Sequence, residues 1–279
     1  MTYTTQERHR QAVWKSHTTT LPDDAKLAAP YVGKTGRPGP QAHPFCLPVE
    51  HAALNLLPEV REGALALFTA EAIPWHAGVG GGPSNHLLSS QVQCVNALGQ
   101  MVHDPDRLVR AFGELLDIDD VLEVEPGRHL TFEYVGPTDF FDEAAGATRT
   151  RGAHCTSVDA AFLHRRRDGL RELVLVEWKY TESYPLRRPD PTKDAVRRSR
   201  YEEAWMAPTP PFAATCCPSS SSWTSRSTSS CASSCSRTSW RRRTRTAPIG
   251  CGCCTSCRRT TTRTSGRWPD PSTARSVPR

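Results

Sequence analysis

Residues 156–180 constrain the fold of this chain more than any other segment. Two apolar-rich runs flank Asp168-Gly169, a dipeptide typical of a β-hairpin turn. The first run contains Asp159, and the second contains Glu177 and Lys179. Two carboxylates and an amine in the middle of apolar strands are costly to place unless they are paired or bind a ligand. The segment therefore predicts a hairpin that carries a functional site.

The length of the hairpin loop decides whether the three charged groups meet. A two-residue loop at Asp168-Gly169 would place Asp159 opposite Trp178, on the face away from Glu177 and Lys179. A three-residue loop, with its glycine in a left-handed bulge position, would place Asp159 opposite Glu177, or opposite Lys179 if the loop lay one residue later. We expect the three-residue loop. The opposite face of the hairpin then carries four apolar residues, Phe162, Val174, Val176 and Trp178.

Asp159, Glu177 and Lys179 fit the chemistry of metal-assisted phosphodiester hydrolysis. Two carboxylates can hold a hard divalent cation that keeps several of its waters, as magnesium prefers. The cation polarises the phosphoryl oxygen and lowers the pKa of a bound water, while the ammonium orients that water or neutralises charge on the phosphate. The alternative is a surface hairpin with a cross-strand ion pair. The apolar residues on the second face favour the functional site.

The order Asp159, then Glu177-Trp178-Lys179 across a hairpin, resembles the Asp-(x)n-Glu-x-Lys motif of the PD-(D/E)xK nuclease superfamily. Residues 151–184 resemble a bacterial restriction endonuclease family, and the resemblance covers about residues 40–206. It implies an α/β, restriction-endonuclease-like fold with an αβββαβ core, in which helices flank a mixed sheet. It also implies that Asp159 and Glu177 bind Mg²⁺ or Mn²⁺, that Lys179 is catalytic, and that the substrate is DNA. Val158 stands where the superfamily often has proline.

Members of this superfamily often take a further metal or water contact from an upstream helix, commonly a Glu. The helix expected here over about 86–98 offers Gln91, which could orient a metal-bound water. A plain helix-surface role is the alternative for Gln91. For the whole chain, the alternative is a catalytically inactive nucleic-acid-binding or partner-binding module with the same fold. Contacts to DNA phosphates could come from the basic residues of the next helix, Lys193, Arg197, Arg198 and Arg200.

The remaining elements are expected in the order helix, three or more strands, helix. Helices are predicted over 3–17, with Val13 and Trp14 as its apolar anchors, over 57–72 and 105–116, and from Thr192 or Asp194. Strands are predicted at 121–124 and 130–135, joined across Pro126-Gly127. We divide the chain into a helix and irregular Pro/Gly-rich arm over 1–48 and a nuclease-like domain over 49–206. The last strand of the core is missing from this set.

Residues 209–279 differ sharply from the rest of the chain. They contain 12 Arg against one Asp, whereas residues 1–208 contain 23 Lys and Arg against 28 Asp and Glu. They also hold eight of the 11 Cys, and Ser, Thr, Arg and Cys fill 49 of these 71 positions. A disordered Ser/Arg tail would seldom carry eight Cys and three Trp, and the spacings match no zinc knuckle.

A change of reading frame explains the composition of the tail. Back-translated with GC-rich codons and read one register over, the tail can encode an apolar segment, a helix and a strand of the kind the core lacks. We therefore predict that residues 207–279 are a disordered, low-complexity frameshift product that begins near 207–216. The net charge of −5 before the tail counts slightly against tight non-specific binding of DNA.

Three features predict a cytoplasmic protein. No apolar run approaches the roughly 20 residues that span a membrane. The first residues lack the apolar core of a signal peptide. The three scattered cysteines before the tail, Cys46, Cys94 and Cys155, fit a reducing compartment better than a disulfide framework.

Overall fold

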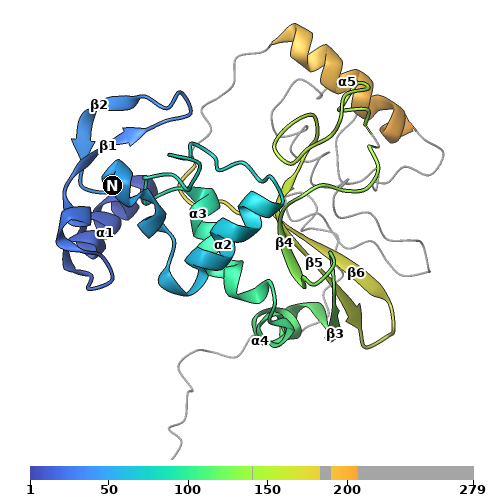
Figure 1. The fold of residues 1–279 in the computed structure, drawn as a ribbon. Helices are drawn as coiled ribbons and strands as arrows, with labels where there is room; N and C mark the ends of the chain where they lie inside the picture. The colour runs from blue at the N-terminus through green and yellow to red at the C-terminus, as the bar shows by residue number, and fades with distance from the viewer. Residues whose placement is uncertain (140, 183–189, 207–279) are drawn as a thin grey trace, which may run out of the picture. The chain divides into compact units, whose positions relative to one another are not determined.

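The computed structural model describes residues 1–139, 141–182 and 190–206. The chain divides into two units, Met1–Arg188 and the residues from Pro189 onward. The described residues of the first unit form the α-helices α1 (Tyr3–His17), α2 (Pro58–Ala70), α3 (Ser90–Leu98) and α4 (Pro105–Leu116) (Figure 1). The second unit contains α5 (Pro191–Met206). The predicted frameshift product and the missing strand lie outside the described residues. None of the described helices is long and apolar enough to cross a membrane.

Side-chain caps set the starts of three helices. Thr2 accepts a hydrogen bond from the backbone N–H of Thr5, Ser89 accepts one from Val92, and Asp104 accepts one from Arg107. Pro58 and Pro105 lie in the first turns of α2 and α4, where a missing N–H costs nothing. The predicted helices over 3–17, 57–72 and 105–116 are confirmed to within two residues.

Helix α3 begins four residues later than predicted, because Asn85 serves another purpose. Its side chain is fully buried. It donates to the carbonyls of Pro30 and Leu47 at 2.8 Å each and accepts from the N–H of Val32 at 3.1 Å. Asn85 therefore anchors the N-terminal arm, and Ser89 caps the helix.

The N-terminal arm contains a β-hairpin, where the sequence indicated an irregular segment. Strands β1 (Ala29–Val32) and β2 (Pro38–His43) pair antiparallel as a separate two-stranded sheet. Helix α1 also differs from the expectation, because Val13 and Trp14 stay largely exposed. Its buried side chains are Glu7 and Lys15, whose polar ends find partners inside the unit.

The main sheet is built around β5 (Val158–Arg166), which pairs antiparallel with three other strands. Strands β3 (Ile118–Leu122) and β4 (Leu130–Tyr134) follow one another along one edge of β5, and β6 (Arg171–Val176) pairs with the other edge. The two strands predicted around Pro126-Gly127 thus exist, but they do not pair with each other. A tight turn bridged by Glu125 and Arg128 separates them.

The β5–β6 hairpin has the predicted three-residue loop. The N–H of Arg166 donates to the carbonyl of Leu170 at 2.8 Å, and Gly169 adopts a left-handed φ of 83°. In the resulting register, Phe162 lies opposite Val174. Phe162 is fully buried, and the other three residues of the predicted apolar face, Val174, Val176 and Trp178, pack against the same core.

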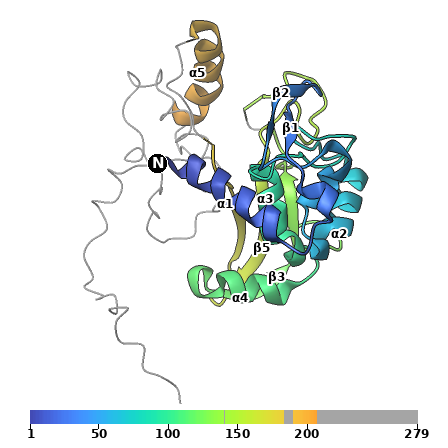
Figure 2. The ribbon, with the colours of Figure 1, turned by 90° about the vertical axis from the view of Figure 1, so that its left-hand side faces the viewer.

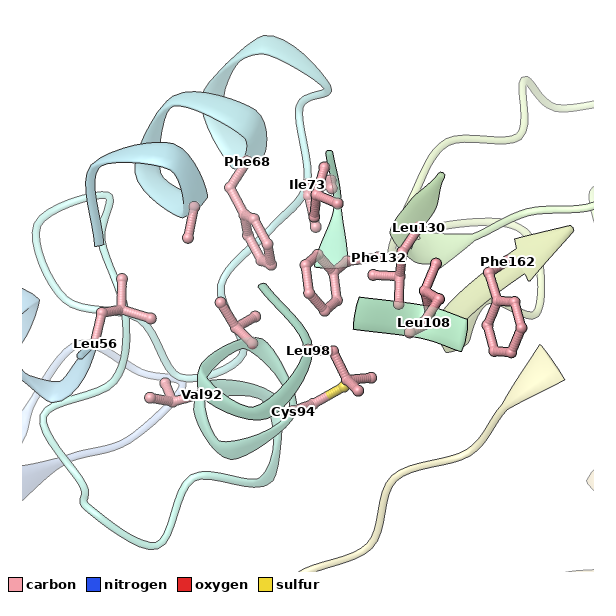
Figure 3. Packing of buried hydrophobic residues seen from close by; sticks show 14 of the residues in the cluster. Leu56, Phe68, Ile73, Val92, Cys94, Leu98, Leu108, Leu130, Phe132 and Phe162 are labelled. Atoms are coloured by element: carbon pink, nitrogen blue, oxygen red, sulfur yellow. The ribbon is translucent and has the colours of Figure 1, made fainter. Parts of the chain in front are cut away.

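One hydrophobic core lies between the sheet and the helices α2, α3 and α4 (Figure 3). Phe68 from α2, Leu98 from α3 and Leu108 from α4 belong to the same cluster as the sheet residues Phe132 and Phe162. In Figures 1 and 2 the hairpin β1–β2 and helix α4 lie at opposite ends of the first unit. This arrangement of antiparallel strands flanked by helices confirms the predicted α/β class.

Candidate active site

Three carboxylates lie in one row, on β4, on β5 and at the residue that directly follows β6. In the β4–β5 ladder Phe132 pairs with Ala160 and Tyr134 pairs with Val158. Glu133 therefore lies opposite Asp159. The β5–β6 ladder ends at Ala160 and Val176, and one step further Asp159 lies opposite Glu177. The predicted register therefore brings the two acidic residues of the motif together.

Asp159 lies one residue beyond the last pair of the β5–β6 ladder. Its Oδ2 accepts a hydrogen bond of 2.6 Å from the backbone N–H of Trp178, between the two charged residues of the motif. Burial raises the pKa of the Asp159 carboxyl, and the carboxylates of Glu177 and Glu133 raise it further. The Trp178 N–H and the ammonium of Lys179 act in the opposite direction. Asp159 thus lies among the other charged groups of the site.

Lys179 and Glu177 form an ion pair, with Nζ 2.9 Å from Oε1. Both side chains are about half exposed, at 49% and 47%. An ion pair this open to solvent adds little stability. The pair can therefore rearrange around a ligand at low cost.

Gln91 lies beside Asp159, Glu133 and Cys94 in a narrow pocket between α3 and the sheet. Its Nε2 donates to Oε1 of Glu133 and to the carbonyl of Pro74, both at 3.1 Å. Its Oε1 accepts from the N–H of His76 at 2.7 Å. The side chain predicted from the upstream helix is thus next to the motif, where it bonds to a third carboxylate.

Glu133 is the residue of this site that the sequence did not reveal. Its carboxylate accepts hydrogen bonds from Gln91 and, at 2.6 Å, from the hydroxyl of Ser157, two residues before Asp159. Its φ of 47° is left-handed, which is a strained conformation for a glutamate within a strand. The available signal was an acidic residue inside the apolar run 130–135, the same kind of signal that singled out Asp159.

The donors at this site are the kind that a hard cation prefers. Asp159 and Glu177 supply carboxylate oxygens, and magnesium is usually bound by one or two carboxylates with several waters. Among the described residues, no three His, Cys, Asp or Glu side chains converge closely enough to hold a metal by themselves. A cation at this position would therefore depend on the predicted pair of carboxylates and on water.

Comparison with known families gives a match over most of the chain. Residues 7–215 match the family described as restriction endonuclease associating with ARP. The chain belongs to this family. No curated protein and no solved structure matches it.

The match to this restriction endonuclease family begins inside α1, and the structure ties α1 directly to the motif. The hydroxyl of Tyr180, the residue after Lys179, donates to Oε2 of Glu7 at 2.9 Å and accepts from Nε2 of Gln11 at 3.0 Å. The hydroxyl of Thr4 donates to the carbonyl of Thr181 at 3.2 Å. Helix α1 therefore holds Tyr180 and Thr181, the two residues that follow Lys179, in place within the first unit.

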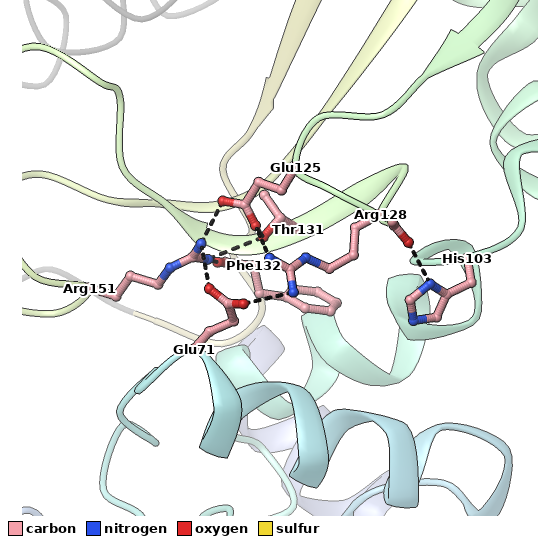
Figure 4. Close-up of polar contacts among 8 residues, drawn as sticks. Glu71, His103, Glu125, Arg128, Thr131, Phe132 and Arg151 are labelled. Carbon is pink, nitrogen blue, oxygen red and sulfur yellow. Dashed lines mark hydrogen bonds and ion pairs between the residues drawn. The ribbon is translucent and has the colours of Figure 1, made fainter.

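A cluster of two arginines and two glutamates is bonded to β4 next to Glu133 (Figure 4). Arg128 pairs with Glu71 at 2.8 Å and with Glu125 at 2.9 Å. Arg151 pairs with the same two glutamates and donates to the carbonyl of Phe132 at 2.6 Å. The cluster thus joins α2, the β3–β4 turn and the segment before β5 directly beside Glu133.

The basic residues predicted to contact DNA lie on α5 in the second unit. Three of them form ion pairs within their own unit: Lys193 with Asp190, Arg197 with Asp194 and Arg198 with Glu202. Their contact with DNA remains a prediction.

Proposed function

We propose that this restriction-endonuclease-like chain is a magnesium-dependent endonuclease that hydrolyses phosphodiester bonds in DNA. The observation that carries the proposal is the register of β5 and β6, which sets Asp159 against Glu177 with Lys179 two residues further on. Membership in a restriction endonuclease family supports DNA as the substrate.

The residues present fit a divalent cation. Asp159, Glu177 and Glu133 carry three negative charges at neutral pH when ionised, and Lys179 is the cation that acts on Asp159. Burial is the first cause of the raised pKa of Asp159, and the carboxylates of Glu177 and Glu133 add to it. A bound magnesium or manganese ion would offset this charge, polarise the phosphoryl oxygen and acidify a bound water.

The residues of the chain have separate tasks in this proposal. Asp159 and Glu177 hold the cation, and the backbone N–H of Trp178 fixes the orientation of the Asp159 carboxylate. Lys179 exchanges its partner Glu177 for the substrate phosphate, where its ammonium offsets developing negative charge or orients the attacking water. Gln91, held by Glu133, keeps the helix side of the site in place.

The test is cleavage of supercoiled plasmid DNA by the purified chain with magnesium, with manganese and with a chelator. We expect cleavage with either metal ion and none with the chelator. Lys179→Ala should lower the cleavage rate about a hundredfold or more, because it removes a group that stabilises the transition state.

Arg171→Ala is the matched control for Lys179→Ala. Arg171 is an exposed cation at the start of β6, eight residues before Lys179, and it lies opposite Arg165. Its removal should leave the cleavage rate unchanged. Equal metal-dependent activity of the chain and of Lys179→Ala would remove the assignment. Binding of DNA without cleavage would favour the inactive nucleic-acid-binding module instead.

A further inference from the structure

The hairpin β1–β2 carries positive charge in a unit that is otherwise acidic. Residues 25–49 contain no Asp or Glu, but they contain Lys26, Lys34 and Arg37. Lys34 and Arg37 lie at the tip of the hairpin, and every residue from 34 to 38 is exposed. Among the residues that the structure describes, neither side chain forms an ion pair with a carboxylate. The tip therefore presents two cations to solvent.

The base of this hairpin is firmly anchored. The buried Asn85 bonds to backbone groups on both sides of it, and the ring of Tyr31 packs edge-on against His86 at 5.0 Å. On the other strand, His43 stacks on Phe45 at 5.0 Å, and the guanidinium of Arg8 lies 5.4 Å from the centre of the Phe45 ring. A two-stranded ribbon is marginal in isolation, so these contacts give the exposed tip a fixed position.

The tip lies on the same side of the unit as the candidate active site. The backbone N–H of His76 donates to Gln91, which in turn bonds to Glu133 in the pocket of Asp159. Burial lowers the pKa of His76 most, and the ammonium of Lys34 lowers it further. The carboxylate of Glu133 raises it. Lys34 and Glu133, one of the three carboxylates of the acidic row, are therefore both near His76.

We propose that the tip of the β1–β2 hairpin contacts the phosphate backbone of duplex DNA and holds it against the site around Asp159. This inference rests on the proposed function for the identity of the polyanion. The charge of the tip is complementary to phosphate, and Lys and Arg contacts to phosphate position a duplex without reading its sequence. They also counter the repulsion expected from the net charge of −5 before the tail. The hairpin therefore supplies affinity and orientation, and the acidic row supplies the chemistry.

The experiment measures the salt dependence of DNA binding by the full chain in a chelator, so that no cleavage occurs. Binding of a labelled 20-base-pair duplex is followed by fluorescence anisotropy between about 50 and 200 mM NaCl, the range in which phosphate contacts are resolved. For Lys34→Gln/Arg37→Gln we expect the slope of log K against log salt to be shallower by about 1.8, since each phosphate contact contributes about 0.9. Affinity should fall equally for unrelated sequences.

Arg107→Gln/Arg110→Gln is the matched control. It removes two arginines from α4, at the opposite end of the unit from the hairpin (Figures 1 and 2). Its slope should equal that of the unaltered chain. The 12 Arg after residue 208 contribute equally to every variant, so the difference between the two slopes isolates the hairpin. Thermal melts should be nearly identical, because exposed substitutions change stability by about 0.5 kcal/mol or less.

Three results would overturn the inference. They are equal slopes for the two double variants, no binding of duplex DNA by the unaltered chain at 50 mM NaCl, and a loss confined to duplex RNA of the same length. Binding without cleavage in magnesium would reject the proposed nuclease activity and leave the slope difference as the test of the hairpin. A slope difference together with unchanged single-turnover cleavage at saturating DNA supports both proposals.

Discussion

The carboxylate of Asp159 occupies a position in which ionisation is unfavourable. Burial and the neighbouring carboxylates raise its pKa above the ordinary value of 3.8. The folded chain then keeps this proton at pH values where the unfolded chain has lost it. Stability therefore falls as the pH rises through the interval between the two pKa values, and it stays lower above that interval. Residues that lower the stability of the fold in this way are typical of functional sites.

Replacing Asp159 by Asn should raise the melting temperature at pH 7 in a chelator. The amide is isosteric, its oxygen can still accept from the N–H of Trp178, and the destabilising charge is gone. Metal-dependent cleavage should fall about a hundredfold or more. Magnesium should raise the melting temperature of the unaltered chain, by mass action, and not that of the variant.

Asp106→Asn is the control for Asp159→Asn, because Asp106 is an exposed carboxylate on α4. It should not show the increase in melting temperature, and it should keep the response to magnesium. A lower melting temperature for Asp159→Asn would mean that the carboxylate holds the fold together, contrary to our interpretation.

At the level of residues, the sequence identified the groups whose charge breaks an apolar pattern. Asp159, Glu177 and Lys179 could be found in this way. Glu133 breaks a pattern as well, but its importance depends on the pairing of β4 with β5 and on its left-handed backbone. Neither property is visible in a local pattern. Gln91 could be found only through the family resemblance.

The β5–β6 hairpin shows how a single glycine supports the register of two strands. Gly169 has a φ of 83°, and no atom lies within 4 Å of the position that a Cβ would take. Its backbone conformation, rather than the space around it, is therefore the constraint. Gly169→Ala should lower the free energy of unfolding by about 1 kcal/mol. Chemical denaturation monitored by circular dichroism measures this change.

Gly63→Ala is the counterpart with the opposite expected sign. Gly63 lies within α2 and likewise has no atom within 4 Å of an added Cβ, but its backbone is helical. Alanine should therefore stabilise the chain by about 0.5–1 kcal/mol. Equal effects of the two substitutions would contradict the left-handed bulge.

The contact between α1 and the end of the motif strand makes a second prediction at the level of elements. Tyr180→Phe removes the hydroxyl that bonds to Glu7 and Gln11, so stability should fall by about 1 kcal/mol. Turnover of DNA should also fall, with little change in KM, because Lys179 is the preceding residue. Plasmid cleavage over a range of DNA concentrations separates the two quantities.

Tyr3→Phe is the control for Tyr180→Phe. Tyr3 is on α1, is 54% exposed and makes an edge-on ring contact with Tyr180 at 6.5 Å. Its hydroxyl should contribute nothing measurable. If Tyr180→Phe had full turnover despite its lower stability, α1 would be a structural element without influence on the site.

The elements were predicted well where local signals and tertiary packing agree. Pro58 and Asp104-Pro105 mark helix starts through local chemistry, a proline in the first turn and a side-chain cap, so α2 and α4 were found. The start of α3 was placed too early because the buried Asn85 bonds to segments about 40 to 55 residues away. The collinear arrangement of β3 and β4 depends on β5, which lies downstream of both.

At the scale of the whole chain, the family match ends at residue 215, inside the interval 207–216 where the composition changes. We expect the coding DNA to show a change of frame in this interval. A chain with the frame restored should melt at a higher temperature, because it would regain the apolar segment and the strand. An unbroken GC-rich frame with ordinary third-position bias through the tail would contradict this expectation.

The position of β5 at the centre of the sheet determines how the loss of the last predicted strand would affect the molecule. β3 and β4 occupy one edge of β5 and β6 occupies the other, so the free edges of the described sheet are the outer edges of β3, β4 and β6. The three residues of the acidic row, Glu133, Asp159 and Glu177, all precede residue 180 in the sequence. A nascent chain without its last strand would thus already display the acidic row, but it would leave an unpaired margin open to a strand of another molecule. Self-association, rather than damage to the site, is the hazard that this topology creates.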